Sequence, residues 1–160
     1  MKKILAIALG ILALDQGIKI FITSNLSLNF SQNIIPNFFN LTYVQNEGAA
    51  FSTFLGGRYF LIIMAFVALI LIYHYLIKNQ KQTRLSIAMN SLLIGGIIGN
   101  MIDRIIRGYV VDYLDFTLFH YQFPIFNLAD ICIVISCFMI VATMIKEDSH
   151  GNQSNRRKPK

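Results

Sequence analysis

The chain has 160 residues, of which 55% are hydrophobic and 14% are charged. A composition this apolar, with a mean hydropathy of +0.56, excludes an ordinary soluble domain and indicates a single-domain membrane protein. The formal net charge is +6, but Lys and Arg lie at the chain ends and in short loops, as the flanking charges of membrane helices do. We therefore expect no nucleic-acid partner, because no basic surface with interleaved aromatic residues is present.

The cysteine and histidine pattern does not predict a metal centre or a redox centre. Cys132 and Cys137 lie five positions apart in an apolar run, which is about 500° around a helix, so they do not share a face. There is no CxxC pair, no Cys/His ligand spacing and no HExxH motif. We interpret both cysteines as small packing residues, and we expect neither a metal nor a cofactor.

The first predicted membrane span covers residues 4–22. Its basic start and apolar middle resemble a secretory signal peptide, but the apolar character resumes after the polar residues 15–17, which favours a retained helix. Asp15 and Lys19 are four positions apart and so share one helix face. Two interpretations stay open: a structural ion pair whose Lys19 reaches out to the membrane surface, or an Asp15 that faces a polar cavity.

Residues 23–57 are the longest segment outside the apolar runs. Residues 39–43 alternate between apolar and polar side chains, as a half-buried strand does, and residues 46–48 carry a turn signal. Gly48 and Ala50 are small enough for another backbone to approach closely. Residues 52–57 are expected to form a short amphipathic helix on the membrane. This segment predicts a small extracytoplasmic unit that contains β structure.

Three further spans are predicted at about 59–77, 85–102 and 125–145. The fold class is therefore an all-α membrane protein, with four transmembrane helices and a small extracytoplasmic β-containing segment. Residues 1–146 form a single domain, and residues 147–160 are a disordered basic cytoplasmic tail. Between the last two spans, residues 103–124 are first polar and then aromatic.

The distribution of basic residues predicts the orientation. Four spans place both termini on one side of the membrane, and that side carries ten Lys and Arg residues against four on the other. The positive-inside rule places both termini in the cytoplasm. The unusual polar residues then converge on the outer face: they are Asp15, Asn46, Asn100, Asp103, Asp112, Asn127 and Asp130.

The chemistry that these residues allow is acid–base catalysis by two carboxyl groups. For a Ser–His–Asp triad, only His120, which lies in a loop, is on the same face as the aspartates, and no GxSxG motif is present. If Asp112 and Asp130 meet, both cannot ionise comfortably, so one proton is shared and one carboxyl acts as base and the other as acid. The alternative is that both residues cap helix starts, although Asp130 lies deep in its predicted span.

Several motifs resemble the lipoprotein signal peptidase family, the bacterial signal peptidase II enzymes. They lie in the order and at the spacing of that family from the first span to the fourth. The motifs are Asp15-Gln16-x-x-Lys19, Asn46-x-Gly48-Ala49-Ala50-Phe51, Gly99-Asn100-x-x-Asp103-Arg104-x-x-x-Gly108-x-Val110-Val111-Asp112 and Phe126-Asn127-x-Ala129-Asp130.

This resemblance implies an aspartyl endopeptidase of the bacterial cytoplasmic membrane, with catalytic residues at Asp112 and Asp130. It implies diacylglyceryl-modified prolipoproteins as substrates, cut just before the lipidated Cys, contact with membrane lipids, and inhibition by globomycin-type lipopeptides. A monomer is expected. The matching positions that would support the substrate or the aspartates are Asp15, Lys19, Asn46, Gly48, Ala50, Asn100, Asp103, Arg104 and Asn127.

Residues 23–57 are expected to cradle the substrate peptide, and the aromatic segment 116–123 to act as a lid in which Phe119 contributes to affinity. A proton-coupled transporter with its aspartates as a relay is the main rival hypothesis. Its carboxylates should spread through the membrane depth, whereas these cluster at one face. A purely structural subunit is the third hypothesis, and it leaves the Asn and Asp cluster without a purpose.

Overall fold

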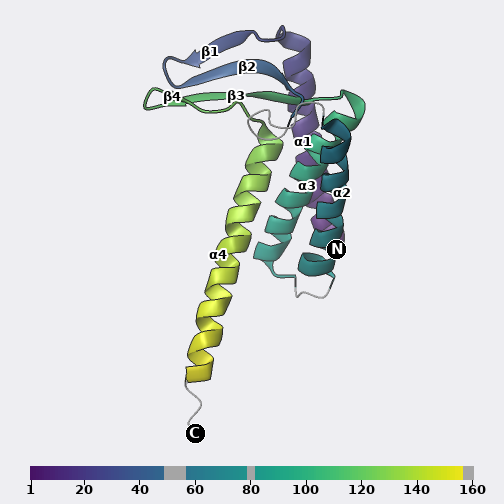
Figure 1. Cartoon of the computed structure of the whole chain (residues 1–160), viewed down its shortest axis with the longest axis vertical. Coiled ribbons are helices and arrows are strands. Elements are labelled where there is room, and N and C mark those ends of the chain that lie inside the picture. The colour runs from purple at the N-terminus through teal and green to yellow at the C-terminus, as the bar shows by residue number, and fades with distance from the viewer. Residues whose placement is uncertain (49–56, 79–81, 157–160) are drawn as a thin grey trace.

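The computed structural model describes residues 1–48, 57–78 and 82–156, the last ten by their backbone alone. Four long helices and a four-stranded antiparallel sheet make up the described chain, and the sheet lies at one end of the helices (Figure 1). In chain order the elements are α1 (Lys2–Asn25), β1 (Ser31–Ile35), β2 (Phe39–Asn46), α2 (Arg58–Ile72) with the π-helical turn η2 (Tyr73–Ile77), α3 (Arg84–Ile106), β3 (Val110–Leu118), β4 (Tyr121–Gln122) and α4 (Leu128–Arg156).

The four helices are long and apolar enough to cross a membrane, and most of their ends lie within a few residues of those of the predicted spans. Helix α3 is the central one, because it contacts α1, α2 and α4. In the most apolar window of α3, 56% of residues are buried, compared with 22% or less in the other three helices. The remaining helices therefore present most of their apolar side chains outward, as lipid-facing helices do.

Small residues let the neighbouring helices approach α3 closely. A Cβ atom on Gly96 would lie 2.6 Å from the backbone oxygen of Ala129 in α4, and one on Gly99 would lie 2.6 Å from the Asp15 carboxylate in α1. Because backbone and a buried carboxylate cannot retreat like a flexible side chain, both positions exclude a larger residue. The glycines thus set how near α1 and α4 come to α3.

The sheet has the strand order β1-β2-β3-β4, and the two faces of its central strands β2 and β3 make different contacts. Leu41 pairs with Leu114, and after an irregularity Val44 pairs with Asp112. On one face, Phe116 stacks between Phe39, at a ring-centroid distance of 4.7 Å, and Phe126, at 5.8 Å. This aromatic stack ties the sheet to the segment that leads into α4.

The opposite face of the sheet carries a polar cluster around Asp115. Thr42 Oγ1 and Gln122 Nε2 donate to the Asp115 carboxylate at 2.8 and 3.2 Å, and Ser31 and Thr42 hydroxyls are bonded at 2.8 Å. Asp115 is buried, so these bonds replace the water that its carboxylate would lose. On the same face Val111 and Tyr113 pack with Ile22 of α1, which places the start of β3 against that helix.

The sheet is larger than the predicted β-containing segment, since the sequence indicated a strand only at residues 39–43. Strands β3 and β4 lie in residues 103–124, which we had interpreted as a polar and then aromatic connection. The first residues of β3 are buried on both sides, at Val110, Val111, Asp112 and Tyr113. A strand covered on both faces lacks the alternation by which strands are found in a sequence.

Helix α4 also differs from its prediction at its start. It begins at Leu128, after the cap residue Asn127, and its bounds run to Arg156. The predicted disorder of residues 147–160 stays a prediction. The short amphipathic helix predicted at residues 52–57 falls almost wholly outside the described residues, as does Ala50.

We expect Gly99→Ala to lower the free energy of unfolding by about 1–3 kcal/mol, because overpacking at the contact with Asp15 must displace α1. Gly17→Ala is the matched control: nothing lies within 4 Å of its added Cβ, and Ala favours the helix by about 1 kcal/mol. Thermal unfolding of both variants in detergent measures the difference. Equal melting temperatures would contradict the close approach of α1 to α3.

Candidate active site

The two aspartates of the predicted pair lie where the sheet meets the ends of α3 and α4. Asp112 comes from β3 and is only 2% exposed, while Asp130 comes from the first turn of α4 and is partly buried. Asn127 lies between them and is fully buried. Its Nδ2 donates to Asp112 Oδ1 at 2.6 Å, and its backbone N–H donates to Asp130 Oδ2 at 3.2 Å. One residue therefore holds both carboxyl groups together.

Asp130 also takes part in the cap of its helix. Its backbone N–H donates to Asn127 Oδ1 at 3.0 Å, and its carboxylate accepts from the Asn127 N–H, which is the reciprocal pattern of a capping box. The cap residue itself is Asn127, so Asp130 contributes to the cap from the third position of α4 while its carboxyl group stays next to that of Asp112. It is not deep in a span, because α4 begins later than predicted.

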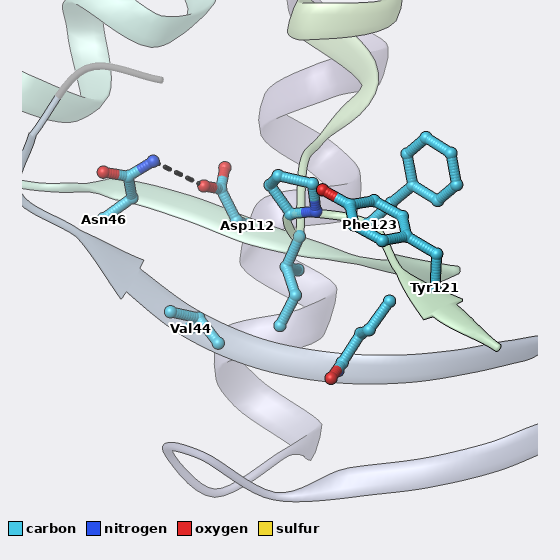
Figure 2. Close-up of a pocket in the computed structure, with 8 residues that line it drawn as sticks. Val44, Asn46, Asp112, Tyr121 and Phe123 are labelled. Atoms are coloured by element: carbon cyan, nitrogen blue, oxygen red, sulfur yellow. Dashed lines mark hydrogen bonds between the residues drawn. The ribbon is translucent and has the colours of Figure 1, made fainter. Parts of the chain in front are cut away.

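The Asp112 carboxylate has a second amide partner. Asn46, the last residue of β2, donates from Nδ2 to Asp112 Oδ2 at 2.8 Å, and its own Oδ1 accepts from the Gly48 N–H at 3.0 Å (Figure 2). The pKa of Asp112 is raised to about 7, first by burial and then by the charge of Asp130, against the hydrogen bonds from Asn46 and Asn127. Such a carboxyl group exchanges its proton near neutral pH.

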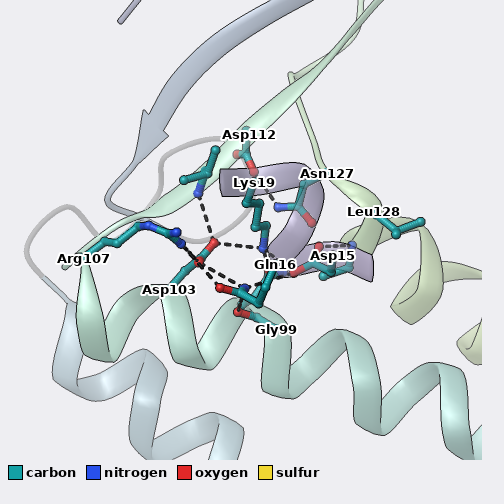
Figure 3. A network of polar contacts seen from close by, with 12 residues as sticks. Asp15, Gln16, Lys19, Gly99, Asp103, Arg107, Asp112, Asn127 and Leu128 are labelled. Carbon is teal, nitrogen blue, oxygen red and sulfur yellow. Dashed lines mark hydrogen bonds and ion pairs between the residues drawn. The ribbon is translucent and has the colours of Figure 1, made fainter. Parts of the chain in front are cut away.

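Behind Asp130 lies an ion network that is sealed from solvent. Asn100 donates from Nδ2 to Asp130 Oδ1 at 2.7 Å, and Lys19 Nζ donates to Asn100 Oδ1 at 3.0 Å. The Lys19 ammonium also lies 2.9 Å from Asp15 and 2.8 Å from Asp103, and all three side chains are 0% exposed (Figure 3). The interpretation in which Lys19 reaches out to the membrane surface is therefore wrong, because Lys19 points inward to Asp15 and Asp103.

The network joins α1 and α3 to the sheet and to α4. Asp103 accepts from the Val111 N–H of β3 at 3.3 Å and forms an ion pair with Arg107, and Asp15 accepts from the Ala129 N–H of α4 at 3.1 Å. Gln16 adds donors to Asp15 and Asp103. The relative placement of β3 and α4, and so of Asp112 and Asp130, depends on these contacts.

Arg104 supports the turn that follows β2. Its Nη2 donates to the Gly48 backbone oxygen at 2.9 Å and its Nη1 to the Asn100 backbone oxygen at 3.3 Å. The structure thus brings together all the candidate residues of the sequence that lie in the described chain.

Sequence reasoning missed Tyr113 of this set, and the affinity role expected for Phe119 stays a prediction. The Tyr113 hydroxyl accepts from the Leu128 N–H at 3.2 Å, and finding it needed the unrecognised strand β3. Phe119 lines a separate pocket with Asn33 and His120, whereas Tyr121 and Phe123 line the pocket that contains Asp112. The tip of the hairpin is therefore not the part nearest the aspartates.

Two pockets converge on the aspartates. One, of about 460 Å³, is lined by Asp112 and Asn46 from one side and by Tyr121 and Phe123 from the other (Figure 2). The second, of about 410 Å³, is almost wholly apolar and runs along α4 from Asp130 to Val134 and Ile135. Phe123 and Pro124 line both pockets, so a partly polar pocket at Asp112 adjoins an apolar one at Asp130.

The chemistry available here is proton transfer by two neighbouring carboxyl groups. Across the described residues, no group of three His, Cys, Asp or Glu side chains is placed to hold a metal ion. Two carboxyl groups held by Asn127 beside a pocket, at the end of a bundle of four helices long and apolar enough to span a membrane, are suited to acid–base catalysis.

Comparison with known proteins identifies the family. Residues 7–146 match the family described as signal peptidase (SPase) II. The chain is 39% identical to the lipoprotein signal peptidase of Halothermothrix orenii, over 91% of this chain and 97% of that one. It is 41% identical to the lipoprotein signal peptidase of Pasteurella multocida, over 88% and 87%. The chain belongs to the signal peptidase II family.

A solved structure supports the fold. A bacterial membrane enzyme determined by the in meso method at 2.3 Å resolution covers all of this chain and 94% of its own, with a TM-score of 0.86 and 34% identity. A second bacterial membrane enzyme gives a TM-score of 0.81 at 35% identity. The four helices and the sheet are therefore shared by membrane enzymes of known structure.

We expect Asp103→Asn to lower the free energy of unfolding by about 3–5 kcal/mol, since it breaks buried ion pairs with Lys19 and Arg107. Asp115→Asn is the control, because Asp115 is equally buried but makes no ion pair among the described residues. The decrease in the free energy of unfolding should be clearly smaller for Asp115→Asn than for Asp103→Asn. Thermal unfolding in detergent compares the two, and a similar loss for both would show that the ion network is not special.

Proposed function

We propose that this protein is an intramembrane aspartyl endopeptidase that removes the signal peptide from diacylglyceryl-modified prolipoproteins, cutting just before the lipidated Cys. The observation that carries the proposal is the pairing of Asp112 and Asp130 through Asn127 beside a pocket with an apolar extension. The names of the relatives, lipoprotein signal peptidases, supply the substrate class.

The proposed reaction uses one ionised and one protonated carboxyl group. The ionised group takes a proton from a water molecule as the water oxygen bonds to the scissile carbonyl carbon, and the protonated group gives its proton to the carbonyl oxygen. The resulting gem-diol collapses when the first carboxyl group delivers the proton that it took to the amide nitrogen. The C–N bond breaks, and a diol proton returns to the second carboxyl group, which restores the starting state.

The apolar pocket suits a substrate that stays in the bilayer. It opens along α4, where Val134 and Ile135 are exposed side chains of a membrane span. A lipidated chain can reach Asp130 by this route without leaving the hydrocarbon region. If the chain left that region, its polar groups would be hydrated and would have to be desolvated again. In this proposal, membrane lipids surround the apolar pocket where it opens along α4.

The proposed orientation places both termini in the cytoplasm and the aspartates near the outer face of the bacterial cytoplasmic membrane. The excess of Lys and Arg at the ends of the helices opposite the sheet supports this orientation. A transporter that relays protons is less well supported, because the buried carboxylates gather towards one end of the helices.

Asp112→Asn and Asp130→Asn should each reduce cleavage of a synthetic diacylglyceryl-modified signal peptide to background, since each removes one half of the acid–base pair. Asp115→Asn, a buried aspartate of the same sheet outside the site, should retain most activity. Mass analysis of the products formed by purified protein in detergent gives the bond that is cut, and globomycin should block it. Cleavage by either variant at the wild-type rate would exclude the pair as the catalytic group.

Phe123→Ala should raise KM about tenfold with a smaller change in kcat, because Phe123 lines both pockets and loses the apolar contact with the substrate. Phe119→Ala is its control in the same hairpin, since Phe119 is 99% exposed and lines a different pocket. Steady-state kinetics on the lipopeptide measures both. A larger KM effect at Phe119 would favour the expectation that Phe119 is the residue of segment 116–123 that contributes to affinity.

A further inference from the structure

Three asparagine amides surround the two aspartates, and the partner of each fixes which way round it lies. Asn100 Oδ1 faces the Lys19 ammonium, which can only donate. Asn46 Oδ1 accepts from the Gly48 backbone N–H, and Asn127 Oδ1 accepts from the Asp130 backbone N–H. A flipped amide would set its NH₂ group against another donor, so none of the three can turn round without losing its bond.

With the oxygens committed, each NH₂ group points at a carboxylate. Asn100 donates to Asp130 at 2.7 Å, while Asn46 and Asn127 donate to Asp112 at 2.8 and 2.6 Å. Both aspartates therefore receive donors, but the donors are not equal. Those of Asp112 are amides bonded to neutral backbone groups, whereas the Asn100 amide is bonded to a positive charge, which polarises its N–H bonds.

Asp130 has a second advantage as the charged partner. Its other oxygen accepts from the Asn127 N–H at the start of α4, where the unpaired N–H groups of the first turn favour negative charge. Asp112 lies on a strand, which supplies no such dipole, and it is 2% exposed. The geometry thus offers more stabilisation to an ionised Asp130 than to an ionised Asp112.

The other charged and titratable groups around the pair do not reverse this difference. From α1 and α3, Asp15 and Asp103 face inward, but each is paired with Lys19, and Asp103 also with Arg107. Arg104 of α3 interacts electrostatically with both aspartates, more with Asp130 than with Asp112, so its charge does not reverse the difference. The Tyr113 hydroxyl of β3 is engaged with the Leu128 N–H.

We propose that Asn100, oriented by Lys19, is the positioning residue that makes Asp130 the ionised member of the pair and leaves the shared proton on Asp112. This inference rests on the proposed function. Asp130 then takes the proton from the attacking water, and Asp112 gives its proton to the substrate carbonyl oxygen. The pKa of Asp112, raised to about 7 by burial and by the charge of Asp130, agrees with a group that keeps its proton below neutral pH.

The pH dependence of kcat/KM tests the assignment. The acid limb reports loss of the proton from the base, and the alkaline limb, near pH 7, reports loss of the proton from the acid, so activity falls as the pH rises through it. Asn100→Leu removes the donor to Asp130 and should move the acid limb up by about one pH unit while the alkaline limb stays. Asn46→Leu removes a donor to Asp112 and should move only the alkaline limb up by a similar amount.

Other outcomes overturn the proposal. If Asn100→Leu moved the alkaline limb and Asn46→Leu the acid limb, the proton would lie on Asp130. If both limbs moved equally or neither moved, Asn100 would not determine which aspartate is the base and which is the acid. A merely structural loss would lower the rate at every pH without moving a limb. Asn100→Ala, which adds no bulk beside Lys19, replaces Asn100→Leu if that variant does not fold.

A second readout separates this inference from the proposed function. Infrared titration of the carboxyl C=O band in substrate-free protein follows the same two proton losses without any catalysis. The pKa of the last proton loss, which we assign to Asp112, should rise in Asn46→Leu and stay unchanged in Asn100→Leu. If no lipopeptide is cleaved but these shifts are found, the proposed function fails and the assignment of the proton to Asp112 stands. If the lipopeptide is cleaved but the last pKa rises in Asn100→Leu instead of Asn46→Leu, the proposed function stands and the assignment fails.

Discussion

The arrangement of the site depends on one buried charge, the Lys19 ammonium. It lies among Asp15, Asp103 and Asn100 with no exposure to solvent. An ammonium moved from water into a protein interior costs several kcal/mol unless it is paired, and here two carboxylates and an amide oxygen surround it. Because each of these partners belongs to a different turn or helix, satisfying Lys19 fixes how α1 and α3 lie against each other.

The carboxylates that balance Lys19 carry this constraint outward. Asp103 reaches the backbone of β3 at Val111, one residue before Asp112, and Asp15 reaches the backbone of α4 at Ala129, one residue before Asp130. Each of the paired aspartates is therefore positioned through the residue next to it in the chain. The glycines of α3 make this possible, since a side chain at Gly99 would occupy the place of the Asp15 carboxylate.

The sheet contributes the other half of the site. Strand β3 supplies Asp112, β2 supplies its partner Asn46, and the β3–β4 hairpin supplies the aromatic residues of the pocket. The aromatic stack of Phe39, Phe116 and Phe126 fixes the sheet against the start of α4. A membrane bundle alone would have placed Asp130 at a helix end without a second carboxyl group to work with.

The sequence by itself determined the four spans, the strand at residues 39–43, the family resemblance and the residues of the candidate site. Apolar runs of span length and charges at their ends are local properties, so they can be recognised without knowing what packs against what. The sequence could not decide whether Lys19 turned outward or inward, since an i, i+4 pair with Asp15 is compatible with both until Asp103 is brought near. It also treated capping and pairing of Asp130 as alternatives, because the helix start at Leu128 and the contact with Asn127 arise together. Strand β3 and the orientation of the asparagine amides were decided only by the tertiary structure, for they depend on partners far away in the chain.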